Sequence, residues 1–162
     1  MTPAEEGILL RLLREAEGCR LEAYLDALAD PPVWTVGYGC TGPGIAEGTV
    51  WTQDQADAEL EARALVAWGD AAYAIGIPWD ALSTARRCAL ADMSYELGRY
   101  RLLGFHQMLY AIQKGDWPQA YKQALASKWA KQVPSRAKRD STMLRDDTLP
   151  WITEGNDDGT TT

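Results

Sequence analysis

Two helix-start signals bracket a segment of different character, and this change of pattern restricts the chain to a fold that mixes helices with strands. Thr2-Pro3-Ala4-Glu5 and Thr52-Gln53-Asp54-Gln55 are capping boxes, in which the first and fourth side chains satisfy each other's backbone N–H groups. Between them, residues 20–50 mix aromatic and β-branched residues with Pro31-Pro32 and five glycines from Gly37 to Gly48. This pattern is typical of short strands and turns. We therefore expect a small antiparallel sheet between two helices.

Apolar residues recur at helical spacing on both sides of this segment. The first helix should run over about residues 3–16, with Glu17 at its carboxyl end, because Gly18 suits the left-handed conformation that closes a helix. The second should run from Thr52 to about residue 74. Beyond Pro78 we expect four more helices: one lined by Leu82, Ala85, Ala89, Met93 and Leu97, one lined by Phe105, Met108, Leu109 and Ile112, one capped by Asp116, and one capped by Ser135 that runs through Leu144.

These elements predict an α+β fold with a single domain over residues 1–145. A small N-terminal lobe of about residues 15–60 would carry a β-hairpin sheet. The helix after Thr52 would connect it to a larger C-terminal helical lobe, which comprises about residues 75–145 together with helix 3–16. A chain of 162 residues suits one compact domain or two small lobes that share a helix. Residues 146–162 should form a polar C-terminal tail, and we expect its final sequence NDDGTTT to be disordered.

Composition argues against several classes of protein. No stretch approaches the roughly 18 continuous apolar residues of a membrane span, and the acidic start of the chain does not match a signal peptide. We therefore expect a soluble protein without stable membrane insertion. The three cysteines form no C-x-x-C pair, and we interpret them as free thiols in a reducing compartment. With one histidine and no HExxH motif, the sequence indicates no metal site.

The formal net charge of −7 conceals an uneven distribution along the chain. Residues 99–145 hold 10 basic and 2 acidic side chains, whereas acidic residues dominate on both sides of this block. Such a block can face a polyanion, either nucleic acid or an anionic cell-wall polymer. It can equally be the solvated surface of helices, where runs of charge are common.

Two carboxylates stand out as a possible catalytic pair. Glu17 lies at the end of the first helix, and Asp26 follows nine residues later in the strand region. Glycoside hydrolysis needs two carboxyl groups that face one bond from two sides, one to protonate the leaving oxygen and one to activate water. The spacing alone is weak evidence, because most Glu/Asp pairs in a chain with 23 acidic residues lie on the surface.

Three separate motifs resemble phage lysozymes of glycoside hydrolase family 24. Residues 17–42, EGCRLEAYLDALADPPVWTVGYGCTG, are similar to the family pattern E-G-x-R-x-x-x-Y-x-D followed by T-x-G-Y/I-G-x-T. Residues 86–98, RRCALADMSYELG, followed by Gly104-Phe105, resemble R-R-A-A-L-x-N-M-x-F-Q-M-G and G-F of the T-even member. Residues 127–145, SKWAKQVPSRAKRDSTMLR, resemble its S-R-W-x-x-Q-x-P-N-R-A-K-R stretch. The order is preserved over nearly the whole chain, which implies a lysozyme-like fold.

The resemblance also implies roles for single residues. Glu17 matches the general acid, Asp26 the carboxylate that acts on water, and Thr35 the hydroxyl that holds this water. The remaining matches are Arg136 for the arginine beside the catalytic glutamate, Tyr95, Glu96 and Gln123 for substrate-binding residues, and Trp129 for a tryptophan packed behind Tyr95 and Glu96. The helix end disfavours an ionised Glu17, whereas Arg136 favours it. The sequence does not decide which of these two effects is larger.

The chain departs from the family pattern at two places near the site. The turn between Asp26 and Thr35 is longer by about three residues and contains Pro31-Pro32, so Asp30 is an alternative second carboxylate. Cys40 replaces the histidine that is usual after G-x-G, which removes an ion pair but no catalytic group.

The function implied by the resemblance is hydrolysis of the β-1,4 bond between N-acetylmuramic acid and N-acetylglucosamine in peptidoglycan, with inversion at the anomeric carbon. No cofactor, metal or nucleic acid is implied, and we expect a monomer. Two other classes remain open: a lytic transglycosylase, which would use Glu17 without the water-holding pair, and a non-catalytic wall-binding or structural phage component. A free endolysin would gather in the host cytoplasm before lysis and depend on a holin, whereas a virion-associated lysozyme would not.

Overall fold

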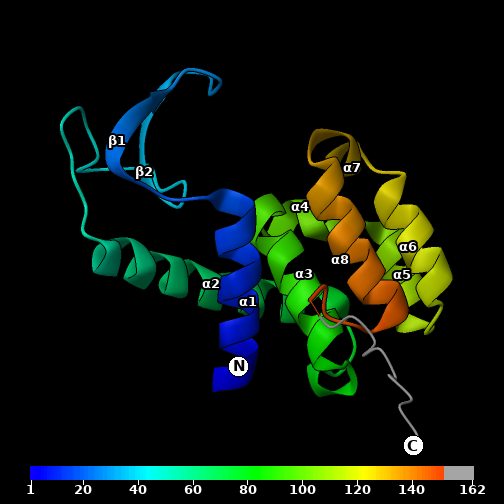
Figure 1. Ribbon diagram of the computed structural model, residues 1–162. Helices are drawn as coiled ribbons and strands as arrows, with labels where there is room; N and C mark the ends of the chain where they lie inside the picture. The colour runs from blue at the N-terminus through cyan, green and yellow to red at the C-terminus, as the bar shows by residue number, and fades with distance from the viewer. Residues whose placement is uncertain (152–162) are drawn as a thin grey trace, which may run out of the picture.

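The computed structural model describes residues 1–151 of the chain, and the rest lies outside the description. Helices dominate it, with one β-hairpin near the N-terminus (Figure 1). In chain order the elements are α1 Pro3–Glu17, β1 Arg20–Asp26, β2 Val33–Gly37, α2 Gln53–Ile75, a 3-10 turn Trp79–Ala81, α3 Thr84–Leu97, α4 Arg99–Leu103, α5 His106–Gln113, α6 Trp117–Leu125, α7 Lys128–Gln132 and α8 Pro134–Asp146.

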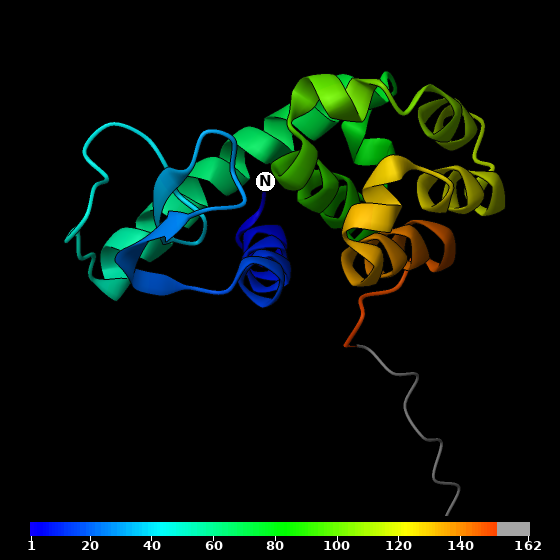
Figure 2. The same cartoon turned by 90° about the horizontal axis from the view of Figure 1, so that it is seen from above.

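The elements form two unequal lobes joined by α2. The antiparallel hairpin β1–β2 stands over the first half of α2, and α3 to α8 gather around the other end of that helix (Figures 1 and 2). The first helix, α1, packs against α3 and α2. This arrangement confirms the predicted α+β class, with a small hairpin lobe, a connecting helix and a larger helical lobe. The proposed domain boundaries stay a prediction.

Local signals set the ends of the helices around the hairpin. Thr2 and Glu5 form the expected capping box on α1, and Thr52 and Gln55 form the one on α2. The first helix ends at Glu17 because Gly18 takes a positive φ of 64°, which turns the chain away from the helix axis. The last carboxylate of α1 therefore lies where the chain enters β1.

One apolar core runs through both ends of α2 and fixes the large lobe. Its fully buried members come from every long helix and include Leu9, Leu13, Leu60, Ile75, Leu90, Met93, Leu102, Ile112, Met143 and Leu144. Burying such a side chain contributes about 1.5–3 kcal/mol, so this core holds the helices that carry the site in place.

Several predicted boundaries were wrong. The helix expected from Leu82 begins at Thr84, because the Ser83 side chain accepts from the Arg86 N–H and caps it, while Leu82 ends the preceding 3-10 turn. Ser135 does not cap the last helix; it lies inside α8, which begins at Pro134 with no side-chain cap. The short helices α4 and α7 were not predicted, since five residues carry too little periodicity to be recognised.

The first residues of the predicted polar tail, 146–151, lie within the described part of the chain. Asp146 is the last residue of α8, and Leu149 and Trp151 pack against the core. The Arg11 guanidinium lies 4.0 Å from the centre of the Trp151 ring. The disorder predicted for the final NDDGTTT, residues 156–162, concerns positions outside the described residues. Within residues 1–151, no helix is long and apolar enough to cross a membrane.

Candidate active site

The hairpin presents three of the predicted residues on one face. Tyr24 pairs with Thr35 and Asp26 pairs with Val33 across the two strands. Side chains alternate between faces along a strand, and directly paired residues share a face, so Tyr24, Asp26 and Thr35 lie on the same side. Thr35 is buried, and its Oγ1 donates to the Val33 carbonyl at 3.3 Å. The pleat of the hairpin therefore aligns a carboxylate with a hydroxyl.

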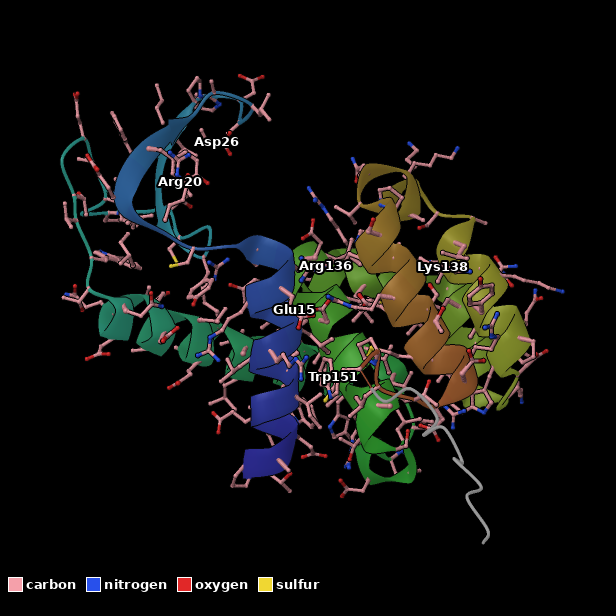
Figure 3. The ribbon with its side chains drawn as sticks, in the orientation of Figure 1. Glu15, Arg20, Asp26, Arg136, Lys138 and Trp151 are labelled. Atoms are coloured by element: carbon pink, nitrogen blue, oxygen red, sulfur yellow. The ribbon has the colours of Figure 1, made fainter. Side chains whose placement is uncertain are left out.

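A cavity of about 530 Å³ lies between this face and the end of α1. The helix terminus brings Glu17 to it, and the hairpin brings the other predicted catalytic residues. Its lining comprises Glu17, Gly18, Cys19, Arg20, Tyr24, Asp26, Thr35, Gly37, Gly39 and Thr41. Figure 3 shows Arg20 and Asp26 on the hairpin and Arg136 beside the upper part of α1. The structure thus brings Glu17, Asp26 and Thr35 together around one cavity.

A tight turn after β2 closes on Glu17. Val36 and Cys40 exchange backbone hydrogen bonds at 2.9 and 2.8 Å, which folds the residues between them into a loop. Gly39 takes a φ of 76°, and a Cβ at this position would stand 3.8 Å from Glu17 Oε2. The motif glycine therefore leaves space beside the carboxylate and supplies a backbone conformation that other residues rarely adopt.

Arg136 on α8 contacts Glu17 directly. Its Nη1 donates to Glu17 Oε1 at 2.6 Å, and the guanidinium is buried with a relative exposure of 8%. Burial lowers the pKa of Arg136, but the Asp92 and Glu17 carboxylates outweigh this effect and raise that pKa above its ordinary value. Arg136 therefore stays charged beside Glu17 at neutral pH.

The same guanidinium nitrogen also binds Glu96. Arg136 Nη1 donates to Glu96 Oε2 at 2.7 Å, so Glu17 and Glu96 share one donor. Both carboxylates line a second hollow of about 610 Å³ together with Val133, Pro134 and Ser135. Glu96, predicted as a substrate-binding residue, therefore lies beside Glu17 on the same guanidinium nitrogen.

Behind Arg136 lies a buried carboxylate that the sequence analysis did not identify. Asp92 has no exposed surface, and its Oδ2 accepts from Arg136 Nε at 2.8 Å and from Arg139 Nη2 at 2.6 Å. Asp140 is equally buried and accepts from Arg139 Nε at 2.9 Å. The available signal was an aspartate inside an otherwise apolar helical stretch, which requires a buried partner.

Tyr95 lies near Glu17 from another side. Burial raises the pKa of its hydroxyl to about 12, so the phenol is protonated at neutral pH. The Arg63 guanidinium lies 4.9 Å from the centre of its ring and donates to Cys40 Sγ at 3.3 Å. Arg63, also missed from the sequence, therefore links α2, the turn after β2 and α3.

Two residues implied by the resemblance lie outside this constellation. Gln123 on α6 lines a separate hollow of about 360 Å³ with Gly104, Phe105 and Met108, and it lines neither hollow that contains Glu17. Trp129 is buried in the core, with its ring edge-to-face against Phe105 at 6.1 Å. The structure therefore does not bring Gln123 to the candidate catalytic residues.

The two rival carboxylates of the hairpin differ in position. Asp26 lines the cavity, and its Oδ1 accepts from the Leu28 N–H at 3.0 Å. Asp30 is exposed in the turn between the strands and is absent from the cavity lining. This placement favours Asp26, whose second oxygen is not used by the turn.

The predicted basic block is partly neutralised by the fold. Arg99, Arg136, Arg139 and Arg145 are in ion pairs with carboxylates of their own chain. Among residues 1–151, no group of three or more His, Cys, Asp or Glu side chains is placed to hold a metal ion.

An acid at a helix end that faces a second carboxylate and a hydroxyl across one cavity is the arrangement of a glycoside hydrolase. Comparison with known proteins agrees with this class. A family model described as phage lysozyme matches residues 14–144. The chain therefore belongs to the phage lysozyme family, whose class is that of the lysozyme-type glycosidases.

Individual relatives are phage proteins of two kinds. The chain is 28% identical over 158 residues to the pre-baseplate central spike protein Gp5 of Enterobacteria phage T4, a match that covers 81% of this chain and 26% of that protein. It is 46% identical over 52 residues to the endolysins of Lactococcus phages c2 and phivML3, covering 32% of this chain and 22% of each endolysin. The chain thus spans about a quarter of the curated relatives that it matches.

Proposed function

We propose that this protein is a peptidoglycan hydrolase of the muramidase type, which cleaves the β-1,4 bond between N-acetylmuramic acid and N-acetylglucosamine. The observation that carries the proposal is the cavity of about 530 Å³ lined together by Glu17, Asp26 and Thr35. Membership of the phage lysozyme family supports the same reaction class. The proposal needs no cofactor, because the chemistry requires only a proton donor, a positioned water and a shaped cleft.

In the proposed mechanism Glu17 protonates the glycosidic oxygen as the bond to the anomeric carbon breaks. Asp26 accepts a proton from a water held by the Thr35 hydroxyl, and this water attacks the opposite face of the sugar. The leaving chain keeps the proton of Glu17, and the water oxygen becomes the new anomeric hydroxyl. A water between carboxylate and sugar requires carboxyl groups roughly 6.5–9.5 Å apart and inverts the configuration.

Product analysis tests this reaction. Digests of purified peptidoglycan should contain reducing-end N-acetylmuramic acid, and NMR of fresh product should show the α anomer. A retained β anomer would contradict inversion. Products with 1,6-anhydro sugars in mass spectra would identify a lytic transglycosylase instead. An absence of any digestion by the folded protein would support the non-catalytic wall-binding alternative.

The second carboxylate can be tested with a matched pair of variants. Asp26→Asn should lower kcat by about 10²-fold or more, because the amide cannot accept a proton from water. Asp30→Asn, four residues after Asp26 in the exposed turn, should retain nearly the full rate. Both rates are measured on the same peptidoglycan preparation. The opposite ranking would transfer the role to Asp30.

The relatives raise a second question, which is where the protein acts. One match is to a spike protein and covers 81% of this chain, whereas two shorter matches are to endolysins. The first supports a virion-associated lysozyme. The second supports a free endolysin that gathers in the host cytoplasm and depends on a holin. Mass spectrometry of purified virions separates the two, since only a virion component would be present in stoichiometric amounts.

A further inference from the structure

Several carboxylates surround Arg136, and their charges bear on the protonation of Glu17, the proposed general acid. Arg136 contacts three carboxylates at once: Glu17 at 2.6 Å, Glu96 at 2.7 Å and Asp92 at 2.8 Å. A single guanidinium cannot neutralise three negative charges. The number of ionised carboxylates beside it therefore decides how strongly it draws the charged form of Glu17.

We propose that Asp92 and Glu96 are positioning residues for Glu17: they hold the Arg136 guanidinium in place and offset its charge, so that Glu17 keeps its proton as an acid catalyst. This inference rests on the proposed role of Glu17 in hydrolysis. It assigns a task to two carboxylates of α3 that contact the same guanidinium.

Geometry shows how Asp92 fixes the arginine. Its two oxygens accept from Arg136 Nε at 2.8 Å and from Nη2 at 3.2 Å, and this paired contact sets the plane of the guanidinium. The Asp92 carbonyl also accepts from Nη2 at 3.3 Å. With one edge of the guanidinium held in this way, Nη1 is directed at Glu17 and Glu96.

The balance of charges around Arg136 is the reason why we assign a proton to Glu17. Burial and the neighbouring Asp92 carboxylate raise the pKa of Asp140 well above its ordinary value, which weakens its part in balancing Arg139. Arg136 and Arg139 then carry two positive charges, and Asp92 and Glu96 balance them. In this proposal Glu17 is the third carboxylate of the cluster and carries the proton.

Other charged groups near Glu17 belong to every element around it. They are Glu15 on α1, Arg20 and Asp26 on β1, the Cys40 thiol after β2, Arg63 on α2, Tyr95 on α3, and Arg139 and Asp140 on α8. Of these cations, Arg63 is engaged with Cys40 and Tyr95. Arg136 is the cation in direct contact with Glu17.

The test compares pH profiles of peptidoglycan cleavage by the wild type, Asp92→Asn and Glu96→Gln. Each variant removes a charge that offsets Arg136, so the alkaline limb of kcat should move to lower pH, by about one unit for Asp92→Asn and by somewhat less for Glu96→Gln. Asp70→Asn removes a carboxylate paired with Arg99 outside this cluster and should leave the limb in place. A purely structural role would lower the amplitude without moving the limb.

A second readout does not depend on activity. NMR titration of 13C-labelled glutamate side chains should place the Glu17 midpoint lower in the variants than in the wild type by the same amount. If Asp92→Asn does not fold, Glu96→Gln still tests the inference. Glu96 is partly exposed, with a side-chain exposure of 32%, so its substitution should be tolerated. If the alkaline limb of kcat and the Glu17 titration midpoint stay unchanged in folded variants, the inference is wrong. An inactive wild type with shifted midpoints would overturn the proposed function and leave the charge coupling intact.

Discussion

Glu17→Gln is expected to abolish turnover almost completely while leaving the fold and wall binding intact. The amide keeps the shape of the carboxyl and can still accept the hydrogen bond from Arg136, but it cannot donate a proton to the leaving oxygen. General acid–base catalysis contributes typically about 10²–10⁴-fold, so kcat should decrease by this amount with little change in KM. Turbidity clearance and reducing-sugar release from purified peptidoglycan measure the loss.

A matched control for this variant is Glu61→Gln, on the exposed surface of α2. It removes the same charge without touching the cavity, and its rate should equal that of the wild type. Far-UV circular dichroism and pelleting with insoluble cell walls show whether Glu17→Gln still folds and binds. A folded variant with more than about a tenth of the wild-type rate would remove Glu17 from the role of general acid.

Arg136→Met is expected to cause the largest loss of stability among single substitutions near the site. Removing one partner of a buried ion pair leaves the other charge without compensation, which costs about 3–5 kcal/mol. Asp92 has no exposed surface and would keep only Arg139 as a cationic partner. Urea unfolding should therefore show a free energy of unfolding lower by roughly that amount.

Lys131→Met, on the exposed surface of α7, is the control and should change stability by less than about 0.5 kcal/mol. A double variant, Arg136→Met with Asp92→Asn, should be less destabilised than the sum of the two single variants, because the unpaired buried charge is removed as well. Additive losses would show that packing of the arginine side chain, rather than charge, carries its contribution.

Some features of this fold follow from signals within a few residues, whereas others depend on contacts between distant parts of the chain. The helix start at Pro3, the end at Glu17 and the strand character of residues 20–37 follow from capping and alternation, which act within a few residues. Asp26 and Thr35 share a face for the same local reason. The boundary error at Leu82 arose because Ser83 caps α3, and the error at Ser135 arose because α8 begins at Pro134 without a side-chain cap.

The sequence by itself therefore determined the order of the elements, the hairpin and the position of Glu17 at a helix end. Only the tertiary structure decided what surrounds that carboxylate: Arg136 lies 119 residues further along the chain and Asp92 lies 44 residues before Arg136. It also placed Gln123 away from the cavity. The physical reason is that such contacts depend on how packed helices sit against one another, and a local pattern shows which face a helix buries but not which charges that burial brings together.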